Sequence, residues 1–214
     1  MKCGENLFIT FEGSDGSGKS TILEKVCETF EKEGRDFIVT REPGGPPLSE
    51  KIRKLLLDPE NKEMTAKTEC LLYAASRAQH VDERIRPALE EGKIVLSDRF
   101  VLSSLAYQGY GRKLGVEEVL EVNRFATGDL SPDLILFFSI DPMVAIQRKR
   151  ENFESDRLEK ETNDFHQRVY QGYEAIMERY KEDSSFQVVD ASGSVEEVYE
   201  NAITIIKTFL GEIE

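Results

Sequence analysis

Cysteine and histidine are scarce in this chain of 214 residues. The three cysteines, Cys3, Cys27 and Cys70, lie far apart and form no C-x-x-C pair. This pattern predicts free thiols in a reducing compartment and indicates no zinc site. The two histidines, His80 and His166, belong to no recognisable nucleophile motif, so we expect structural or surface roles for both.

Long apolar runs and an excess of positive charge are also missing. The longest apolar run is far shorter than a membrane span, and residues 1–6 lack the apolar centre of a signal peptide. We therefore expect a soluble, cytoplasmic protein with no membrane partner. The chain has 28 Lys and Arg against 41 Asp and Glu, a net charge of −13, which opposes binding to a nucleic-acid backbone. Basic residues inside a phosphate-binding cleft remain compatible with this surface.

Alternating strand and helix patterns fill the chain, without internal repeats. Strands are predicted at residues 6–11, 37–40, 93–97, 133–140 and 186–189. Helices are predicted at residues 22–30, 48–57, 65–91, 116–127, 142–150, 159–180 and 195–210. Strands separated by helices require crossovers, so we expect one α/β domain over residues 1–214, with a central five-stranded parallel sheet flanked by helices. In such sheets ligands bind beyond the carboxyl ends of the strands.

The first strand leads into a glycine-rich loop that fits G-x-x-x-x-G-K-[ST] and opens a helix. The loop runs Gly13-Ser14-Asp15-Gly16-Ser17-Gly18-Lys19-Ser20, followed by Thr21. Its glycines let backbone N–H groups turn inward on an anion, and the helix points its positive end at the same place. Lys19 is then a charge for the outer phosphates of a nucleotide, and Ser20 a ligand for Mg²⁺. The alternative is a glycine-rich turn without a ligand.

Two further strands end in notable residues. The third strand ends in charged residues, and the second is followed by a stretch rich in Pro and Gly. Asp98 and Arg99 end the third strand, where the carboxylate is placed to orient Mg²⁺ and the guanidinium to grip a phosphate. An N-cap aspartate paired with a neighbouring arginine is the alternative. After the second strand, residues 40–47 are rich in Pro and Gly, which predicts either a simple turn or a pocket wall.

Two features outside the strand ends also allow a functional or a structural interpretation. Tyr73 and Arg77 stand four residues apart and share a helix face, as an ordinary cation–π pair or as part of a site. The basic segment at residues 148–157 is either a solvated face or a mobile lid near the phosphates.

Four motifs together resemble the thymidylate kinases, a family of P-loop nucleoside monophosphate kinases, over nearly the whole chain. The motifs are residues 11–21 (FEGSDGSGKST), 40–45 (TREPGG), 73–79 (YAASRAQ), and 98–109, which contains DRF and SSLAYQG. The first is shared by many nucleotide kinases, whereas the other three are specific to the family. The resemblance implies the three-layer P-loop NTPase fold.

The resemblance implies transfer of the γ-phosphoryl of ATP to dTMP, with Mg²⁺ as cofactor, to give dTDP and ADP. The attacking phosphate, with a second pKa near ~6, is already largely dianionic at neutral pH, so no general base is required. Charge neutralisation and in-line positioning are required instead. The resemblance also implies a homodimer built on the long helix that carries Tyr73 and Arg77.

Site roles follow from the resemblance position by position. The loop from Gly13 to Thr21 would hold the phosphates of ATP. Lys19, Asp15 and Arg99 would be catalytic residues. Asp15 would also contact the sugar 3′-hydroxyl of dTMP. Arg99 and Arg53 would clamp the dTMP phosphate, Arg41 would support the same wall, and Ser20 and Asp98 would serve the metal.

The resemblance assigns the base and sugar of dTMP to other residues. Tyr73 would stack on thymine, Arg77 would donate to the 4-keto oxygen, and Ser104 would meet N3. Tyr107 and Gln108 would close the sugar side, with Tyr107 leaving little room for a 2′-hydroxyl. Pro43 would line the pocket after a cis Glu42–Pro43 bond.

The position of Gly16 distinguishes two kinds of thymidylate kinase. Some members carry an arginine there, whereas others, of the bacterial type, supply the charge from a lid. With glycine at this position, the lid at about residues 148–158 would supply it, and its catalytic candidates are Arg148, Arg150 and Arg157. The sequence departs from the family at Pro46, where threonine is common, and at Phe100, where tyrosine or histidine is usual.

Two other functions remain open at this point. A P-loop ATPase switch would change shape without an acceptor, but the N-K-x-D motif of GTPase-type switches is incomplete, since Asn61-Lys62 lacks its aspartate. A related kinase could use another acceptor such as dUMP, because one methyl group is worth only about 1–3 kcal/mol of discrimination.

Overall fold

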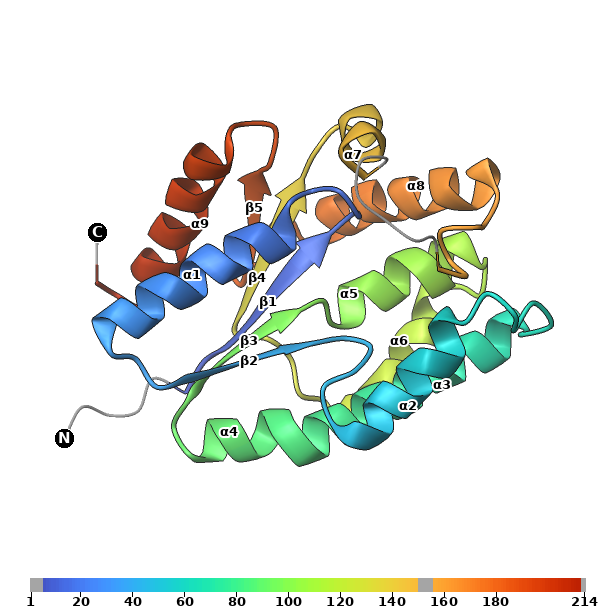
Figure 1. The fold of residues 1–214 in the computed structure, drawn as a ribbon, viewed down its shortest axis with the longest axis horizontal. Helices are drawn as coiled ribbons and strands as arrows, with labels where there is room; N and C mark the ends of the chain where they lie inside the picture. The colour runs from blue at the N-terminus through green and yellow to red at the C-terminus, as the bar shows by residue number, and fades with distance from the viewer. Residues whose placement is uncertain (1–5, 150–155, 213–214) are drawn as a thin grey trace.

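A five-stranded parallel sheet forms the centre of the described part of the molecule (Figure 1). The computed structural model describes residues 6–149 and 156–212. The strands are β1 (Phe8–Gly13), β2 (Phe37–Arg41), β3 (Ile94–Asp98), β4 (Leu134–Ser139) and β5 (Phe186–Asp190). Their order across the sheet is β2-β3-β1-β4-β5, with every neighbouring pair parallel. The predicted five-stranded parallel sheet is confirmed, and each strand overlaps its predicted range.

Helices cover both faces of this sheet (Figure 1). They are α1 (Lys19–Glu33), α2 (Pro47–Leu57), α3 (Ala66–His80), η1 (Val81–Ile85), α4 (Arg86–Glu90), α5 (Val101–Ser104), η2 (Leu105–Gly111), α6 (Val116–Thr127), α7 (Pro142–Lys149), α8 (Asn163–Tyr180) and α9 (Val195–Phe209). The segments η1 and η2 are π-helical. No helix among the described residues has the length and apolar character needed to cross a membrane.

Successive residues of a strand point to opposite faces, and the buried strands use both. In β4, Leu136 and Phe138 belong to the apolar core shared with α1 and α9. Ile135 and Phe137 belong to the core shared with η2 and α8 on the other face. A third cluster joins Phe8 of β1 to η1 and α4. The carboxyl ends of the strands are therefore held rigidly between two helical layers.

The helix predicted over residues 65–91 is present, but its hydrogen-bond register changes along the way. Thr65 caps α3 by accepting from the backbone N of Thr68. In η1 the backbone N of Arg86 donates to Val81 O, a wider turn than an α-helix makes. Proline has no N–H to donate, and this change of register falls immediately before Pro87.

One helix begins later than the sequence predicts, and one helical segment was not predicted. The helix predicted from residue 159 begins at Asn163, because Thr162 caps it by accepting from the backbone N of Phe165 at 3.3 Å. The helical segment α5–η2 was not predicted at all. Gly111 weakens its helical pattern but permits close packing, since a Cβ there would lie 2.8 Å from the ring of Phe165 in α8.

Candidate active site

The predicted phosphate loop lies at the carboxyl edge of the sheet, between Gly13 of β1 and Lys19 of α1. Gly16 has φ of 82°, in the left-handed region that glycine adopts without strain. A Cβ on Gly16 would lie only 2.3 Å from the carbonyl oxygen of Ala145 in α7. A larger residue at position 16 would therefore displace α7, and this position contributes no side chain to the loop.

The amino group of Lys19 is held inside the loop. Its Nζ donates to Ser14 O at 2.7 Å and to Ser17 Oγ at 3.3 Å. Burial lowers the pKa of Lys19 to about 8, and the charge of Arg99 acts in the same direction. The loop thus keeps a positive charge in a fixed place with little surrounding water.

Ser20 and Asp98, the predicted metal residues, meet beside the loop. Ser20 Oγ donates to Asp98 Oδ2 at 2.8 Å, while Asp98 Oδ1 is buried without a hydrogen-bond partner in the described structure. Hydroxyl and carboxylate oxygens are ligands that Mg²⁺ accepts, usually through one or two carboxylates together with substrate phosphates. The donor set and the unpartnered Oδ1 therefore fit Mg²⁺.

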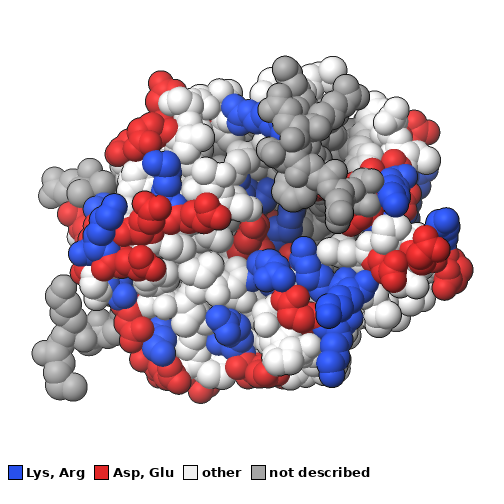
Figure 2. Space-filling model, in the orientation of Figure 1, with Lys and Arg blue, Asp and Glu red and all other residues white. Residues whose placement is uncertain are grey.

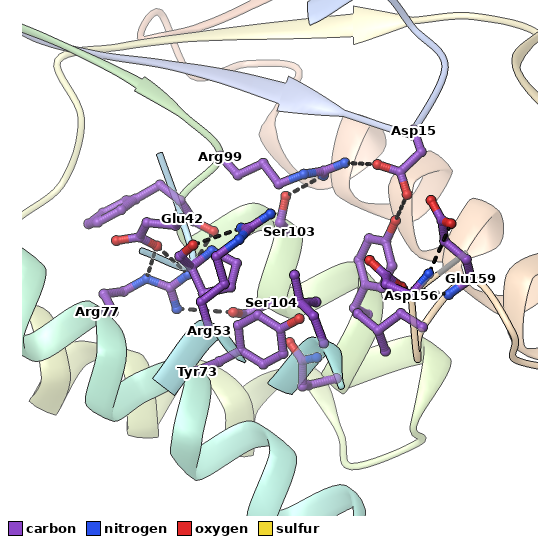
Figure 3. A pocket seen from close by; sticks show the side chains of 16 residues that line it. Asp15, Glu42, Arg53, Tyr73, Arg77, Arg99, Ser103, Ser104, Asp156 and Glu159 are labelled. Carbon is purple, nitrogen blue, oxygen red and sulfur yellow. Dashed lines mark hydrogen bonds and ion pairs between the residues drawn. The ribbon is translucent and has the colours of Figure 1, made fainter. Parts of the chain in front are cut away.

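Arg99 occupies an uncommon backbone position directly after β3. Its φ of 71° places a non-glycine residue in the left-handed region. Its Nη1 donates to Gly13 O at 3.0 Å, Ser103 Oγ at 2.9 Å and Tyr173 Oη at 3.1 Å. Its Nη2 forms an ion pair with Asp15 (Figure 3). The guanidinium is thereby fixed at the junction of the phosphate loop and the neighbouring pocket.

Glu12, to which the sequence analysis assigned no role, binds the residue that follows Arg99 and the Ser103 hydroxyl that Arg99 also contacts. It accepts from the backbone N of Phe100 at 2.7 Å and from Ser103 Oγ at 2.6 Å. Burial raises the pKa of Glu12, although these hydrogen bonds and the charge of Arg99 oppose the change. Glu12 lies within the 11–21 motif and, in β1, stands among largely apolar residues, but neither feature indicated its partners.

A pocket opens beside Arg99, between the 42–43 turn and helices α2, α3, α5 and η2 (Figure 3). Its lining brings together nine of the ten predicted substrate residues: Asp15, Pro43, Arg53, Tyr73, Arg77, Arg99, Ser104, Tyr107 and Gln108. Arg41 lies outside this pocket and lines a neighbouring hollow together with Ser20. Its guanidinium forms an ion pair with Glu50 at 3.0 Å. The Glu42–Pro43 peptide bond is cis. Arg53 donates to Pro43 O at 2.8 Å, which ties α2 to this turn.

The closed end of the pocket is built around Arg77. Its Nε donates to Glu42 Oε2 at 2.7 Å, and its Nη2 to Phe100 O at 3.0 Å. Its Nη1 donates to Ser104 Oγ at 3.0 Å and to Asn123 Oδ1. All three nitrogens of this buried guanidinium thus have protein acceptors. Ser104 accepts from Arg77, so its hydroxyl hydrogen can be donated to a ligand.

Glu42 was not predicted, although it lies within the 40–45 motif. It is buried between Arg77 and His80, and its Oε1 lies 2.9 Å from His80 Nδ1. Burial alone would raise the pKa of Glu42, but Arg77 and His80 hold it below its usual value. His80 Nε2 in turn lies 2.6 Å from Thr40 Oγ1, so this histidine has a structural role.

Segment η2 contributes Tyr107 and Gln108 to the pocket lining. Tyr107 Oη donates to Asp15 Oδ2 at 2.9 Å. Gln108 Nε2 donates to Glu69 Oε1 at 2.9 Å, and Glu69 is fully buried on α3. The same carboxylate accepts from Arg112 at 2.7 Å. This anchor for Gln108 gave no signal in the sequence.

The two predicted lid arginines that the structure describes differ in their surroundings. Arg148 lines the hollow beside the phosphate loop and donates to Ala191 O at 3.0 Å. Arg157 is 8% exposed and is held away from both pockets, since it donates to Leu56 O and to Glu69 Oε2, each at 2.7 Å. Arg150 lies outside the described residues.

A second hollow extends from the phosphate loop past Arg148 to residues 191–195. It shares five residues with the first pocket, so the two join there: Asp15, Arg53, Arg99, Asp156 and Glu159. Figure 2 shows Lys and Arg side chains gathered near the centre of this face, whereas acidic side chains dominate its left edge. Two anionic ligands could therefore meet end to end at Asp15 and Arg99.

The comparisons with known proteins agree on one family. The thymidylate kinase family model matches residues 11–202. The chain is 55% identical over 201 residues to the thymidylate kinase of Finegoldia magna, covering 94% of this chain and 98% of that one. It is 51% identical over 208 residues to that of Bacillus licheniformis, with 96% and 97% covered. The crystal structure of thymidylate kinase from Ehrlichia chaffeensis matches with a TM-score of 0.76 at 30% identity, covering 94% of this chain and 98% of that one.

Proposed function

The chain belongs to the thymidylate kinase family, and we propose that its joined pockets hold ATP and dTMP end to end for phosphoryl transfer. The reaction moves the γ-phosphoryl of ATP to the phosphate of dTMP and gives dTDP and ADP. The proposed arrangement rests on the junction of the two hollows, where both are lined by two arginines, Arg53 and Arg99. Three acids line both hollows as well: Asp15, Asp156 and Glu159. A P-loop switch without an acceptor is not favoured, because it would not need the second pocket.

The phosphates are placed by backbone and cationic groups. The loop N–H groups and Lys19 would hold the β- and γ-phosphates of ATP, with the adenine toward residues 191–195. Arg99 and Arg53 would grip the phosphate of dTMP as its oxygen attacks the γ-phosphorus and the bond to ADP breaks. Ser20 and Asp98 would hold Mg²⁺, which when bound neutralises the charge that develops on the transferring group. No proton must leave the attacking oxygen, so the site needs no general base.

The nucleoside part of dTMP is placed by the pocket beside Arg99. Tyr73 would stack on the base, with Arg77 and Ser104 facing its polar edge. Arg77 has no acceptor capacity, so cytosine's amino group would meet another donor there. Asp15, fixed by Arg99 and Tyr107, would accept from the 3′-hydroxyl of the sugar. The buried Glu69 would keep Gln108 in place on the sugar side.

A coupled assay of ADP release tests this proposal. The purified protein is given Mg²⁺, ATP and, in separate reactions, dTMP, dUMP, dCMP, dGMP or UMP. We expect the highest kcat/KM with dTMP and residual activity with dUMP, since a single methyl group separates them. ADP release at the same rate without any acceptor would contradict the arrangement and favour an ATPase.

The pKa of Lys19 predicts a split between two pH profiles. Below pH about 8 the ligand-free protein carries a charged Lys19, and above it the charge is lost. Bound phosphates favour the charged form and raise this pKa. We therefore expect kcat/KM for ATP to fall above pH about 8 while kcat persists to higher pH, because the two parameters report free and bound enzyme. Identical profiles for both parameters would contradict this role.

We also propose a homodimer formed through α3 and α6. These helices pack side by side and expose Leu71 at 59% and Phe125 at 92%. Exposed apolar side chains on adjacent helices are a feature of subunit interfaces. Phe125→Glu should convert a dimer into a monomer in sedimentation at micromolar concentration. The control Phe209→Glu, on α9, should leave the dimer intact, and a monomeric unmodified protein would refute the interface.

The proposal also covers the organisation and location of the protein. Residues 1–214 would act as one kinase domain. The predicted lid at about residues 148–158 includes residues 150–155, which lie outside the described residues. Cys27 and Cys70 are free thiols, which supports a cytoplasmic location.

A further inference from the structure

A separate cavity lies behind the dTMP pocket, between β1, α5 and α6. Its volume is about 250 Å³. Its walls are largely apolar and include Leu102, Leu120, Leu130, Ile135 and Tyr180. An apolar cavity of about 150 Å³ is already large enough to bind benzene. The space is therefore sufficient for a small organic molecule with a single ring.

The most buried residues that line the cavity include a threonine whose hydroxyl group has no partner in the described structure. Thr10 of β1 lines the cavity and is 0% exposed, and its Oγ1 has no hydrogen-bond partner in the described structure. Two other buried polar groups that line the cavity are engaged, since Glu12 accepts from Phe100 and Ser103, and Asn123 donates to Val119 O. Because a buried hydroxyl without a partner is unfavourable, Thr10 marks where a bound polar atom would be stabilised.

We propose that this cavity is a second binding site for a small uncharged molecule with an aromatic or branched aliphatic body and one hydroxyl group. The apolar walls would bury the body, and the hydroxyl would pair with Thr10 Oγ1. Anions are disfavoured because Asp129 and Asp183 stand at the mouth, and the nearby Arg124 is already paired with Asp129 at 3.1 Å. The buried carboxylate of Glu12 acts against anions in the same way.

The cavity shares a wall with the dTMP pocket. Phe100 lines both, and its carbonyl oxygen accepts from Arg77. Asn123 also lines the cavity and accepts from Arg77. A molecule in the cavity therefore contacts two of the residues that hold Arg77 at the base end of the pocket. Occupancy of the cavity and of the dTMP pocket should be coupled, and by linkage each ligand must change the other's affinity by the same factor.

Benzyl alcohol is a suitable probe because it has one ring and one hydroxyl group. Its binding to the full chain is measured by ligand-observed NMR, with and without saturating dTMP. We expect saturable binding of benzyl alcohol at millimolar concentration. We also expect dTMP to change the Kd of benzyl alcohol, and benzyl alcohol to change the Kd of dTMP by the same factor. Binding of benzyl alcohol depends on none of the catalytic roles proposed above. A failure to bind benzyl alcohol can therefore be distinguished from a failure of the proposed kinase activity.

Two variants locate the probe. Thr10→Val keeps the shape of the side chain and removes its hydroxyl, and should weaken binding about 3- to 10-fold. Leu120→Trp places a larger side chain in the cavity and should abolish binding, whereas Phe209→Trp on α9 should leave it unchanged. Thermal unfolding checks that each variant is folded. If Leu120→Trp is not folded, the binding measured for Thr10→Val alone decides whether the cavity is the binding site.

Three outcomes would overturn the proposal. They are the absence of saturable binding, equal binding by folded Leu120→Trp, and equal binding by Thr10→Val. An affinity for benzyl alcohol that dTMP leaves unchanged would overturn the coupling between the two pockets.

Discussion

Replacing Lys19 by methionine is expected to lower kcat by about 10³-fold. The amino group lies inside the phosphate loop, 2.7 Å from Ser14 O. Phosphates bound by the loop would lie next to it. A fixed charge in a site with little water stabilises developing negative charge strongly, and loss of one such group costs about 10²- to 10³-fold in rate. Steady-state kinetics with saturating ATP and dTMP would measure the effect.

The melting temperature of Lys19→Met distinguishes a loss of catalysis from a loss of folded protein. Lys19 is buried and its pKa is lowered by that burial, so removing its charge should not lower the melting temperature. Lys32→Met, on the exposed side of the same helix, is the matched control and should retain full activity. Normal turnover by Lys19→Met would contradict the assigned role of the loop.

Replacing Arg148 by alanine is expected to lower kcat by ~10²-fold while sparing dTMP affinity. Arg148 lies on α7 and lines the hollow that contains the phosphate loop. It does not line the dTMP pocket, so its loss should act on transfer and not on acceptor binding. Rapid-quench kinetics for transfer and calorimetry for dTMP binding would measure the two effects separately.

Arg157→Ala is expected to behave differently from Arg148→Ala. Its guanidinium holds Glu69, which in turn holds Gln108, so its loss should raise KM for dTMP and lower stability. Arg179→Ala, at an exposed ion pair with Glu117, should change neither parameter. If Arg148→Ala, Arg150→Ala and Arg157→Ala all turn over normally, the lid does not supply the catalytic charge.

The sequence predicted those parts of the fold and site that depend on local patterns. The phosphate loop was identifiable because glycine, lysine and serine must stand at fixed spacing between a strand and a helix. The sheet was predictable because apolar strands alternated with helical periodicity along the chain. Nine of the ten residues that the resemblance assigns to the substrate line one pocket, but their roles came from the resemblance and not from local patterns.

The sequence did not predict features that arise from contacts between distant segments. Segment α5–η2 is helical because it packs against α8, where Gly111 and Gly172 allow close approach. Glu12, Glu42 and Glu69 are buried acids whose partners lie on other elements. Glu69 lies 88 positions before Arg157, so no local pattern relates the two. Such pairs become evident only in three dimensions.

The contact between Gly16 and α7 has a consequence for how this enzyme could change. A Cβ at position 16 and the carbonyl oxygen of Ala145 would compete for one volume. An arginine introduced into the loop would therefore push away the helix that carries Arg148. If α7 supplies the catalytic charge as proposed, an arginine in the loop would disturb that source, and exchanging one for the other would require α7 to be rebuilt together with the loop.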